Sequence, residues 1–229
     1  MYFMFKKIYL FFYRKINSVP LDVKVGLQPV SRLFGFDRGT PIDRFYVNKF
    51  IKSNADLING SVLEVGDNQY TKQYGTNIHR SVVIAGSVDD AECFDVDLTN
   101  KNSYSSIGFF DCVIATQVLN FIYDMKSAVE GLHSLTKPGG VVIITLAGLA
   151  QISRYDADRW GDFWRFSNMS AQRIFEEFFE NVEVRTFGNV RSATAFMQGL
   201  SSEDLTNREL EYFDEDYQVV VCVKAIRAA

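Results

Sequence analysis

The chain of 229 residues has little histidine, cysteine or proline: two, three and four residues, respectively. With His79 and His133 alone, a zinc site built on histidine ligands is not expected, and we predict no bound metal. The cysteines Cys93, Cys112 and Cys222 are scattered and odd in number, so they fit neither a disulfide framework nor a metal-binding spacing. This pattern predicts reduced thiols in a cytoplasmic protein.

The chain also lacks an excess of positive charge and a long apolar run. Its net charge of −4 argues against non-specific binding to nucleic acid. Residues 1–15, MYFMFKKIYLFFYRK, are aromatic and apolar, but a bilayer span needs about 20 such residues. A signal peptide fits poorly, because no small-residue cleavage site follows.

Two interpretations of residues 1–15 remain open. They can form an interfacial helix whose aromatic side chains enter the membrane while the basic residues meet anionic lipid. This would place the protein at the inner face of the membrane. Alternatively, they form a helix that packs on the domain or on a second subunit.

What the chain does have is enough apolar residues for one sizeable core. Hydrophobic residues make up 47% of it, with Phe 20 and Tyr 11, and we see neither repeats nor a low-complexity linker. We therefore predict one α/β domain, in which residues 1–54 are an N-terminal helical extension and residues 55–229 the core. Some aromatic surface should line a cleft or an interface.

The stretch SVLEVGDNQYTKQYG, residues 61–75, organises this core. Val62, Leu63 and Val65 form a short apolar run of the kind found in buried parallel strands. Glu64 lies near its end, and Gly66 follows at the turn. A carboxylate and a glycine at this point suit a ligand with hydroxyls or an amine.

Further apolar runs and helical spacings follow in an alternating order. Residues 125–135 predict a helix and Lys137–Gly140 a turn, while residues 20–36 read as a connection with a short helix. Thr40 is a candidate N-cap for a helix with Pro41 at its first position. Two final strands should complete the sheet, the last one antiparallel. The other predicted strands are 79–85, 93–100, 112–115, 141–146, 181–187 and 217–226.

Polar residues follow several of these strands. Thr116 and Gln117 lie at the C-terminal edge of the clearest central strand, on the same face of the sheet as Glu64 and Asp97. Asp97 also fits an ordinary Asx turn. His133 lies on the following helix, where packing or capping competes with a catalytic role.

Two arginines and an aromatic segment are candidates for substrate contacts. Arg38 and Arg44 flank a capped turn and form either surface charges or an anion clamp. The segment RYDADRWGDFWRFS, residues 154–167, mixes aromatic rings with arginines and aspartates. Rings that stack on sugar C–H groups and charged groups that bind hydroxyls would suit a sugar, while a cover loop with internal ion pairs is the alternative.

Taken together, these pieces resemble the S-adenosylmethionine-dependent methyltransferases of class I. Their first motif is Glu/Asp-x-Gly-x-Gly-x-Gly; in EVGDNQYT only Gly66 stands in place, with Asn68 and Tyr70 at the other glycine positions. The run FDCVIATQVLNFIYD, the helix after it and LTKPGGVVIITLAG match the middle of that domain in order and spacing. RGTPIDRFY, EVGDNQYT and DRWGDFWRFS look like a bacterial subgroup associated with glycan and surface-polysaccharide synthesis.

The resemblance implies a doubly wound, mostly parallel, seven-stranded sheet with helices on both faces, and S-adenosylmethionine as cofactor. It implies O-methylation of a sugar hydroxyl of a bacterial cell-surface glycan or its precursor. The family's acid after the second strand is missing, because Gly86 and Ser87 stand there, so the ribose contact stays unassigned. Alternatives are a degenerate partner module and a small-molecule methyltransferase; a nicotinamide dehydrogenase would need Gly-x-Gly-x-x-Gly, which is absent.

The residues assigned on this basis fall into three sets. The predicted cofactor-binding residues are Glu64, Gly66, Asp67, Tyr70, Asp97, Leu98, Thr116 and Gln117. The candidates for the base that takes the hydroxyl proton are Asp156, Asp162 and His133. The predicted substrate-binding residues are Arg38, Arg44, Tyr155, Trp164 and Arg165.

Overall fold

The computed structural model describes residues 2–16 and 26–229. The predicted connection over residues 20–36, with its short helix, lies partly outside this range, and its residues 26–36 form bends and turns. The chain divides into two compact units. The sheet unit comprises residues 47–148, 152–186 and 221–229, and the second unit comprises residues 1–46, 149–151 and 187–220.

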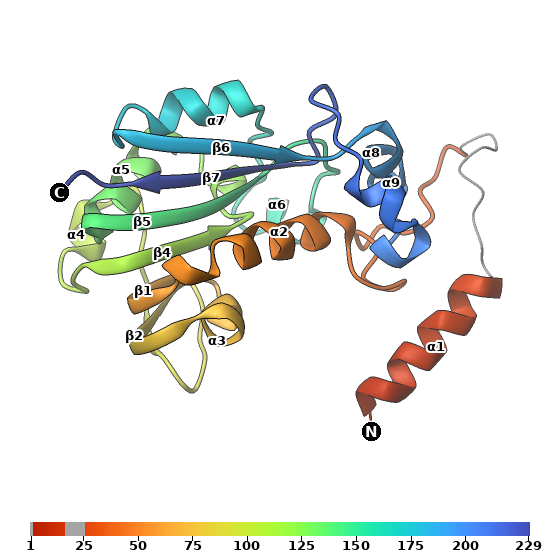
Figure 1. The fold of residues 1–229 in the computed structure, drawn as a ribbon, viewed down its shortest axis with the longest axis horizontal. Helices are drawn as coiled ribbons and strands as arrows, with labels where there is room; N and C mark the ends of the chain where they lie inside the picture. Colours follow the sequence, from red (N-terminus) through yellow and green to blue (C-terminus); the bar gives the residue numbers. More distant parts are fainter. Residues whose placement is uncertain (1, 17–25) are drawn as a thin grey trace. The chain divides into compact units, whose positions relative to one another are not determined.

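Seven strands form one sheet in the order β3-β2-β1-β4-β5-β7-β6 (Figure 1). Strands β1 to β5 pair in parallel. The amide of Gly139 donates to the carbonyl of Arg227 (2.9 Å), and the amide of Arg227 donates to Gly140 (3.0 Å), so β7 runs antiparallel to β5. The predicted fold class is confirmed, including its antiparallel last strand. The strands are β1 (Asn59–Val65), β2 (Thr76–Ile84), β3 (Glu92–Phe94), β4 (Phe110–Thr116), β5 (Thr136–Ala147), β6 (Asn181–Phe187) and β7 (Val220–Ile226).

The central strands are buried on both faces. Leu63 of β1 pairs with Val113 of β4, which pairs with Val142 of β5, and all three are fully buried. Strands covered on both sides carry continuous apolar runs without alternation, which is why they stand out in the sequence.

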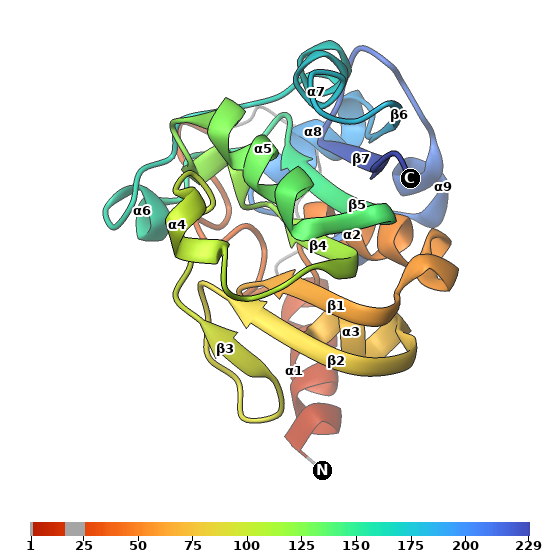
Figure 2. The same ribbon diagram turned by 90° about the vertical axis from the view of Figure 1, so that its left-hand side faces the viewer.

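Helices cover both faces of the sheet. On α5 the residues Met125, Ala128, Val129, Leu132 and Leu135 are buried, as their helical spacing predicts. Figure 2 shows α4 and α5 on one face and α3 on the other. The helices of the sheet unit are α3 (Gln69–Tyr74), α4 (Lys101–Tyr104), α5 (Met125–Leu135), α6 (Arg154–Ala157) and α7 (Asn168–Phe175).

The second unit is built around α8 (Val190–Met197) and α9 (Asn207–Glu211) and also contains α1 (Tyr2–Ile16). The helix α2 (Ile42–Ser53) begins in it and ends in the sheet unit. Near its start, the Tyr46 hydroxyl donates to the carbonyl of Leu210 (2.9 Å).

Three local predictions are wrong. The strand predicted over residues 93–100 is limited to β3 (Glu92–Phe94), and residues 95–100 form no strand. The segment Lys137–Gly140 is a bulge inside β5 instead of a turn before it, because the register jumps between the pairs Phe110↔Thr136 and Cys112↔Val141. Helix α2 begins at Ile42, one residue after the predicted start, and Thr40 does not serve as its N-cap. Both the amide and the hydroxyl of Thr40 donate to Glu203 (2.8 and 3.1 Å).

Candidate ligand site at the carboxyl edge of the sheet

Left-handed backbone follows the last residues of three neighbouring strands. Gly66 after β1, Ala85 after β2 and Gln117 after β4 have φ of 94°, 54° and 57°. The Gly66 amide donates to the carbonyl of Ile84 (2.9 Å), so the turns after β1 and β2 are adjacent. A non-glycine residue rarely adopts a positive φ, because this backbone conformation costs free energy. Residues that do adopt it are concentrated at ligand-binding and catalytic sites.

Gly66 and its neighbour Gly86 leave room beside this backbone. A Cβ atom on Gly66 would meet nothing within 4 Å, whereas one on Gly86 would lie 1.7 Å from the Gly66 carbonyl oxygen. Gly86 is therefore needed for the close approach of two strand ends, and Gly66 opens space at the edge where doubly wound sheets bind ligands.

Glu64 is buried and connects β1 to the first turn of α3. Its Oε1 accepts a hydrogen bond from the amide of Tyr70 (3.1 Å), and its Oε2 accepts from the amide and hydroxyl of Thr71 (2.9 and 2.7 Å). Burial raises the pKa of Glu64 to about 7, although these donors pull it down. The carboxylate thus positions the loop, and the predicted contact with the cofactor is not needed to explain it.

Asn68, at one of the missing glycine positions, carries a buried acceptor. It is 3% exposed, and its Nδ2 donates to Asp90 (3.1 Å). Its Oδ1 is buried and has no hydrogen-bond partner among the described residues. Such an orphaned acceptor suits a ligand that donates an amine or hydroxyl proton. Sequence reasoning noted Asn68 as a departure from the motif and missed it as a site residue.

The loop around Asn68 is further tied down by Asp90. The Asp90 carboxylate pairs with Lys72 (2.7 Å), and this ion pair holds the pKa of Asp90 below its usual value. Of the other predicted loop residues, half-buried Asp67 accepts a hydrogen bond from the amide of Gln69 (3.0 Å), and half-buried Tyr70 supplies the amide that binds Glu64.

Asp97 and Leu98 follow β3 along the chain. Asp97 is exposed, and its Oδ1 accepts from the amide and hydroxyl of Thr99 (2.9 and 2.7 Å), which is the Asx turn kept open as an alternative. Leu98 is 4% exposed and packs in the core. The second oxygen of Asp97 remains available to a ligand.

The end of β4 is held by β5 next to it. The amide of Gln117 donates to the carbonyl of Thr145 (2.8 Å), and its side-chain amide donates to the Thr145 hydroxyl (3.4 Å). Thr116 pairs with Thr145 in the sheet and is half-buried. Both residues therefore lie at the carboxyl end of β4, as predicted.

Three aromatic side chains form an exposed platform just beyond β4. We call Tyr123, Phe163 and Trp164 the aromatic platform; they are 71%, 47% and 38% exposed. The Tyr123 ring stacks on Trp164 (5.8 Å between centroids) and meets Phe163 edge-on (5.4 Å). The Trp164 indole donates to the carbonyl of Ile122 (3.1 Å), which fixes its orientation.

Asn120 attaches this platform to the end of β4. Its backbone carbonyl accepts from the amides of Phe163 (2.9 Å) and Trp164 (3.2 Å). Its side-chain Oδ1 is buried without a hydrogen-bond partner in the part of the chain that the structure describes. It is a second orphaned acceptor, and no motif in the sequence pointed to it.

Asp162 serves this segment as a buried ion-pair partner. Its side chain is 1% exposed, pairs with Arg165 (2.5 and 2.9 Å) and accepts from the amide of Ser153 (3.1 Å). Burial raises the pKa of Asp162, but Arg165, Ser153 and the Asn120 side chain outweigh it and hold the pKa below its usual value. A carboxylate with a lowered pKa is a poor general base near neutral pH.

The other two candidate bases are also engaged elsewhere. The Ser153 hydroxyl donates to Asp156 (2.5 Å) at the start of α6, so Asp156 completes a helix cap. His133 lies on the last turn of α5, just before β5 begins, at the amino edge of the strands. Its ring meets Phe179 edge-on (5.0 Å), and burial and Arg227 lower its pKa. The structure therefore does not bring the three predicted bases together.

The predicted substrate-binding residues come from both units. Arg38 and Arg44 belong to the second unit. Arg38 is 2% exposed and forms a bidentate pair with Asp204 (2.8 and 2.9 Å), so the predicted anion clamp is instead a structural ion pair. Tyr155 is covered by the Arg159 guanidinium, 3.5 Å from the ring centroid, while Trp164 lies in the aromatic platform.

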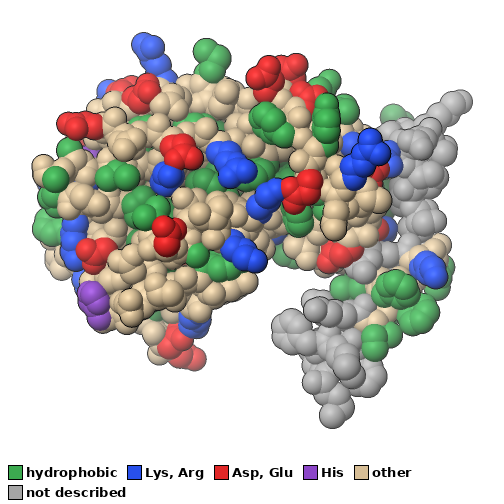
Figure 3. Space-filling model, viewed as in Figure 1, with side chains coloured by type: hydrophobic (Ala, Val, Ile, Leu, Met, Phe, Trp, Pro, Cys, Tyr) green, Lys and Arg blue, Asp and Glu red, His purple; other side chains and the backbone are tan. Residues whose placement is uncertain are grey.

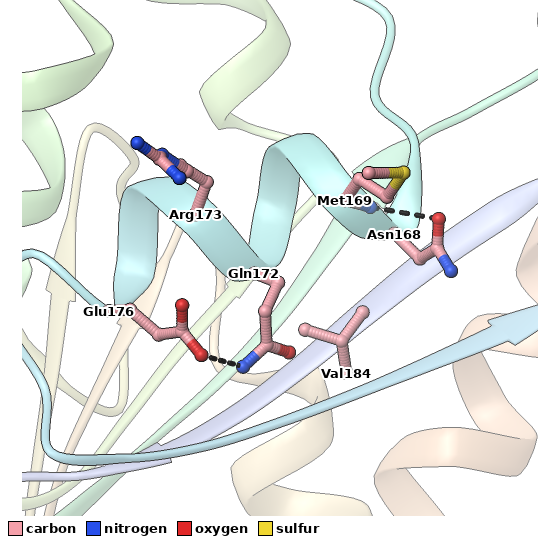
Figure 4. A pocket seen from close by; sticks show the side chains of 6 residues that line it. All are labelled: Asn168, Met169, Gln172, Arg173, Glu176 and Val184. Atoms are coloured by element: carbon pink, nitrogen blue, oxygen red, sulfur yellow. Dashed lines mark hydrogen bonds between the residues drawn. The ribbon is translucent and has the colours of Figure 1, made fainter.

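A separate hollow of about 300 Å³ runs between α7 and β6 (Figure 4). The side-chain amide of Gln172 donates to Glu176 across its floor (2.5 Å). It contains none of the predicted site residues, and we assign it no part in the ligand site. Its lining is Asn168, Met169, Gln172, Arg173, Glu176 and Val184.

Three further observations concern metal ligands, surface charge and the cysteines. Within residues 2–16 and 26–229, no cluster of His, Cys, Asp and Glu side chains has the make-up of a metal site. On the face drawn in Figure 3, lysine and arginine side chains are interspersed with acidic ones. The three cysteines are free thiols, and Cys112 and Cys222 are buried.

Comparison with known proteins points to one enzyme class. Residues 63–144, from β1 to β5, match the family model described as "Methyltransferase domain". This span contains the three left-handed turns, Asn68, Asp97 and Asn120. The family match and the fold support an S-adenosylmethionine-dependent methyltransferase. A search of curated proteins finds no match.

Solved structures share the fold at low sequence identity. The N-methyltransferase NodS from Bradyrhizobium japonicum WM9, in complex with S-adenosyl-L-homocysteine, is 14% identical with a TM-score of 0.53; the match covers 88% of this chain and 95% of NodS. Phosphoethanolamine N-methyltransferase 2 from Haemonchus contortus is 13% identical (TM-score 0.51), covering 96% of this chain and 57% of that one. The YcgJ protein from Bacillus subtilis is 8% identical (TM-score 0.50), covering 81% and 99%. At these identities the likeness concerns the fold.

Proposed function

We propose that the protein transfers a methyl group from S-adenosylmethionine to a sugar hydroxyl of a bacterial cell-surface glycan or its precursor. The proposal of a sugar acceptor rests on the aromatic platform. The backbone carbonyl of Asn120, which follows β4, binds the amides of Phe163 and Trp164 in this platform. Exposed rings in fixed orientations suit the C–H faces of a sugar.

The chain's own residues fit the cofactor at three points. Asn68 offers a buried acceptor without a partner, Gly66 leaves open space beside the backbone, and Asp97 has an exposed carboxylate oxygen. The Asn68 side chain would accept a hydrogen bond from an amine or a ribose hydroxyl of the cofactor. Asp97 would accept one from the adenine amine. Glu64 would act indirectly, by holding the loop that carries Asn68.

When bound, S-adenosylmethionine supplies a methyl group on a positively charged sulfonium, so alignment of the acceptor is the main catalytic requirement. Transfer forms an oxygen–carbon bond, breaks the sulfur–carbon bond with its electron pair left on sulfur, and releases the hydroxyl proton. With Asp156, Asp162 and His133 engaged elsewhere, we assign release of this proton to water at the exposed edge. Asp162 and Arg165 act as positioning residues, because their ion pair holds the segment that carries Phe163 and Trp164.

The acceptor assignment is tested by methyl transfer from radiolabelled S-adenosylmethionine to sugar nucleotides and surface-polysaccharide fragments. Trp164→Ala should raise KM for the acceptor about tenfold and leave the affinity for S-adenosylmethionine unchanged. Trp160→Ala is the matched control, because this exposed ring lies in the same segment outside the platform. An equal effect of both variants, or label only in non-sugar acceptors, would contradict the sugar assignment.

A second candidate is a partner module that has lost cofactor binding. It is favoured by Asn68 and Tyr70 at two glycine positions and by the use of both Glu64 oxygens within the protein. The orphaned Asn68 oxygen speaks against it, because a buried acceptor without a ligand costs free energy.

A further inference from the structure

Helix α1 lies at the start of the chain (Figure 1). It exposes one continuous apolar face. Ile8, Tyr9, Phe12 and Ile16 are 47%, 64%, 56% and 81% exposed. At 3.6 residues per turn, these four positions fall within about 100° of arc around the helix. Figure 3 shows hydrophobic side chains on the described part of this helix. A contiguous exposed apolar face of this kind marks an interaction surface.

The charges of α1 are all of one sign. Its sequence YFMFKKIYLFFYRKI holds Lys6, Lys7, Arg14 and Lys15 and no acidic residue. The Lys15 ammonium lies 5.7 Å from the centre of the Phe11 ring, so basic and aromatic groups are adjacent at the surface. A protein partner covering this helix would have to supply every counter-charge, and a second copy of α1 has no acidic residue to offer.

The length of α1 restricts how it can meet a bilayer. Fifteen residues make a helix about 22 Å long, shorter than the ~30 Å hydrocarbon core. In the described residues, no helix is long and apolar enough to cross a membrane. An exposed apolar face on a helix whose charged residues are all basic is the pattern of helices that lie within the membrane interface.

We propose that α1 binds the surface of an anionic lipid bilayer, with Ile8, Tyr9, Phe12 and Ile16 inserted among the acyl chains. The basic residues provide attraction to the anionic headgroups, and the apolar face provides insertion. This proposal is independent of the methyl-transfer proposal.

The test is flotation of the full chain with vesicles of phosphatidylcholine alone or with added phosphatidylglycerol. The protein should float with the anionic vesicles, and high salt should weaken the association. Phe12→Glu should lower the bound fraction about tenfold, since it places a charge in the inserted face. Phe213→Glu is the matched control, because Phe213 is 56% exposed, as Phe12 is, and lies outside α1.

A second variant keeps the test valid if Phe12→Glu alters the helix. The combined substitutions Lys6→Gln, Lys7→Gln, Arg14→Gln and Lys15→Gln should abolish the preference for anionic vesicles and leave the circular dichroism spectrum unchanged. The proposal is overturned if the unmodified chain binds neither vesicle, binds both equally, or loses as much binding through Phe213→Glu as through Phe12→Glu. A dimer detected by light scattering that Phe12→Glu dissociates, without vesicle binding, would overturn it in favour of self-association.

Discussion

The buried carboxylate of Glu64 should make the stability of this protein depend on pH. Its pKa is raised from 4.5 to about 7, so the folded state binds a proton at Glu64 more tightly than the unfolded chain does. The proton on Glu64 therefore stabilises the folded state fully below pH 4.5, and this stabilisation is lost as the pH rises through about 7. Proton linkage with these two pKa values lowers the free energy of unfolding by about 2.5 kcal/mol between pH 5 and pH 8.

Urea unfolding at several pH values measures this loss for the wild type and for Glu64→Gln. The amide cannot ionise, so the variant should lack the Glu64 part of the pH dependence, about 2.5 kcal/mol, whatever its absolute stability. In thermal unfolding the same difference corresponds to roughly 5–10 °C.

The control for this experiment is Glu92→Gln. Glu92 is exposed and pairs with Arg80 (3.0 Å), and this pairing lowers its pKa. Glu92→Gln should therefore lose as much free energy of unfolding between pH 5 and pH 8 as the wild type does. If the wild type and Glu64→Gln lose equal stability over this range, the raised pKa and the burial argument behind it are wrong.

Three further predictions concern the ion pair, the adenine contact and the histidine. Asp162→Asn should lower the free energy of unfolding by about 3 kcal/mol in urea, because it removes the buried carboxylate that holds Arg165. Asp158→Asn, at an exposed pair, should change nothing measurable, and similar values for the two variants would refute the positioning role. Asp97→Ala should weaken S-adenosylmethionine binding roughly tenfold in calorimetry while Asp95→Ala, at an exposed neighbour, does not, and unchanged affinity would remove Asp97 from the site. His133→Ala should leave the methyl-transfer rate unchanged in the radiolabel assay, because its ring packs on Phe179 at the amino edge; a rate lowered a hundredfold would return His133 to the reaction.

The fold could be read from the sequence because its strongest signals are local. Runs such as Cys112–Ala115 are buried on both faces, and the apolar spacing of α5 is regular, so each element is visible in its own residues. The Lys137–Gly140 bulge was misread, because proline and glycine mark a turn and a bulge alike, and the pairing with β4 and β7 decides between them.

The site was less predictable, because residue type does not reveal which partner a side chain meets. Asp162 and Arg38 carry the groups that a base and an anion clamp need, yet each is engaged by an ion-pair partner: Arg165, three residues away, and Asp204, far along the chain. Asn68 and Asn120 had no catalytic signature, and their importance follows from burial that leaves an oxygen without a partner.

Calorimetric titration of the purified chain with S-adenosylmethionine and S-adenosylhomocysteine tests the central claim most directly. The account predicts binding of both with micromolar dissociation constants, and weaker binding by Asn68→Ala, which removes the orphaned acceptor. A folded protein that binds neither compound at millimolar concentration would contradict the methyltransferase proposal and favour the partner module.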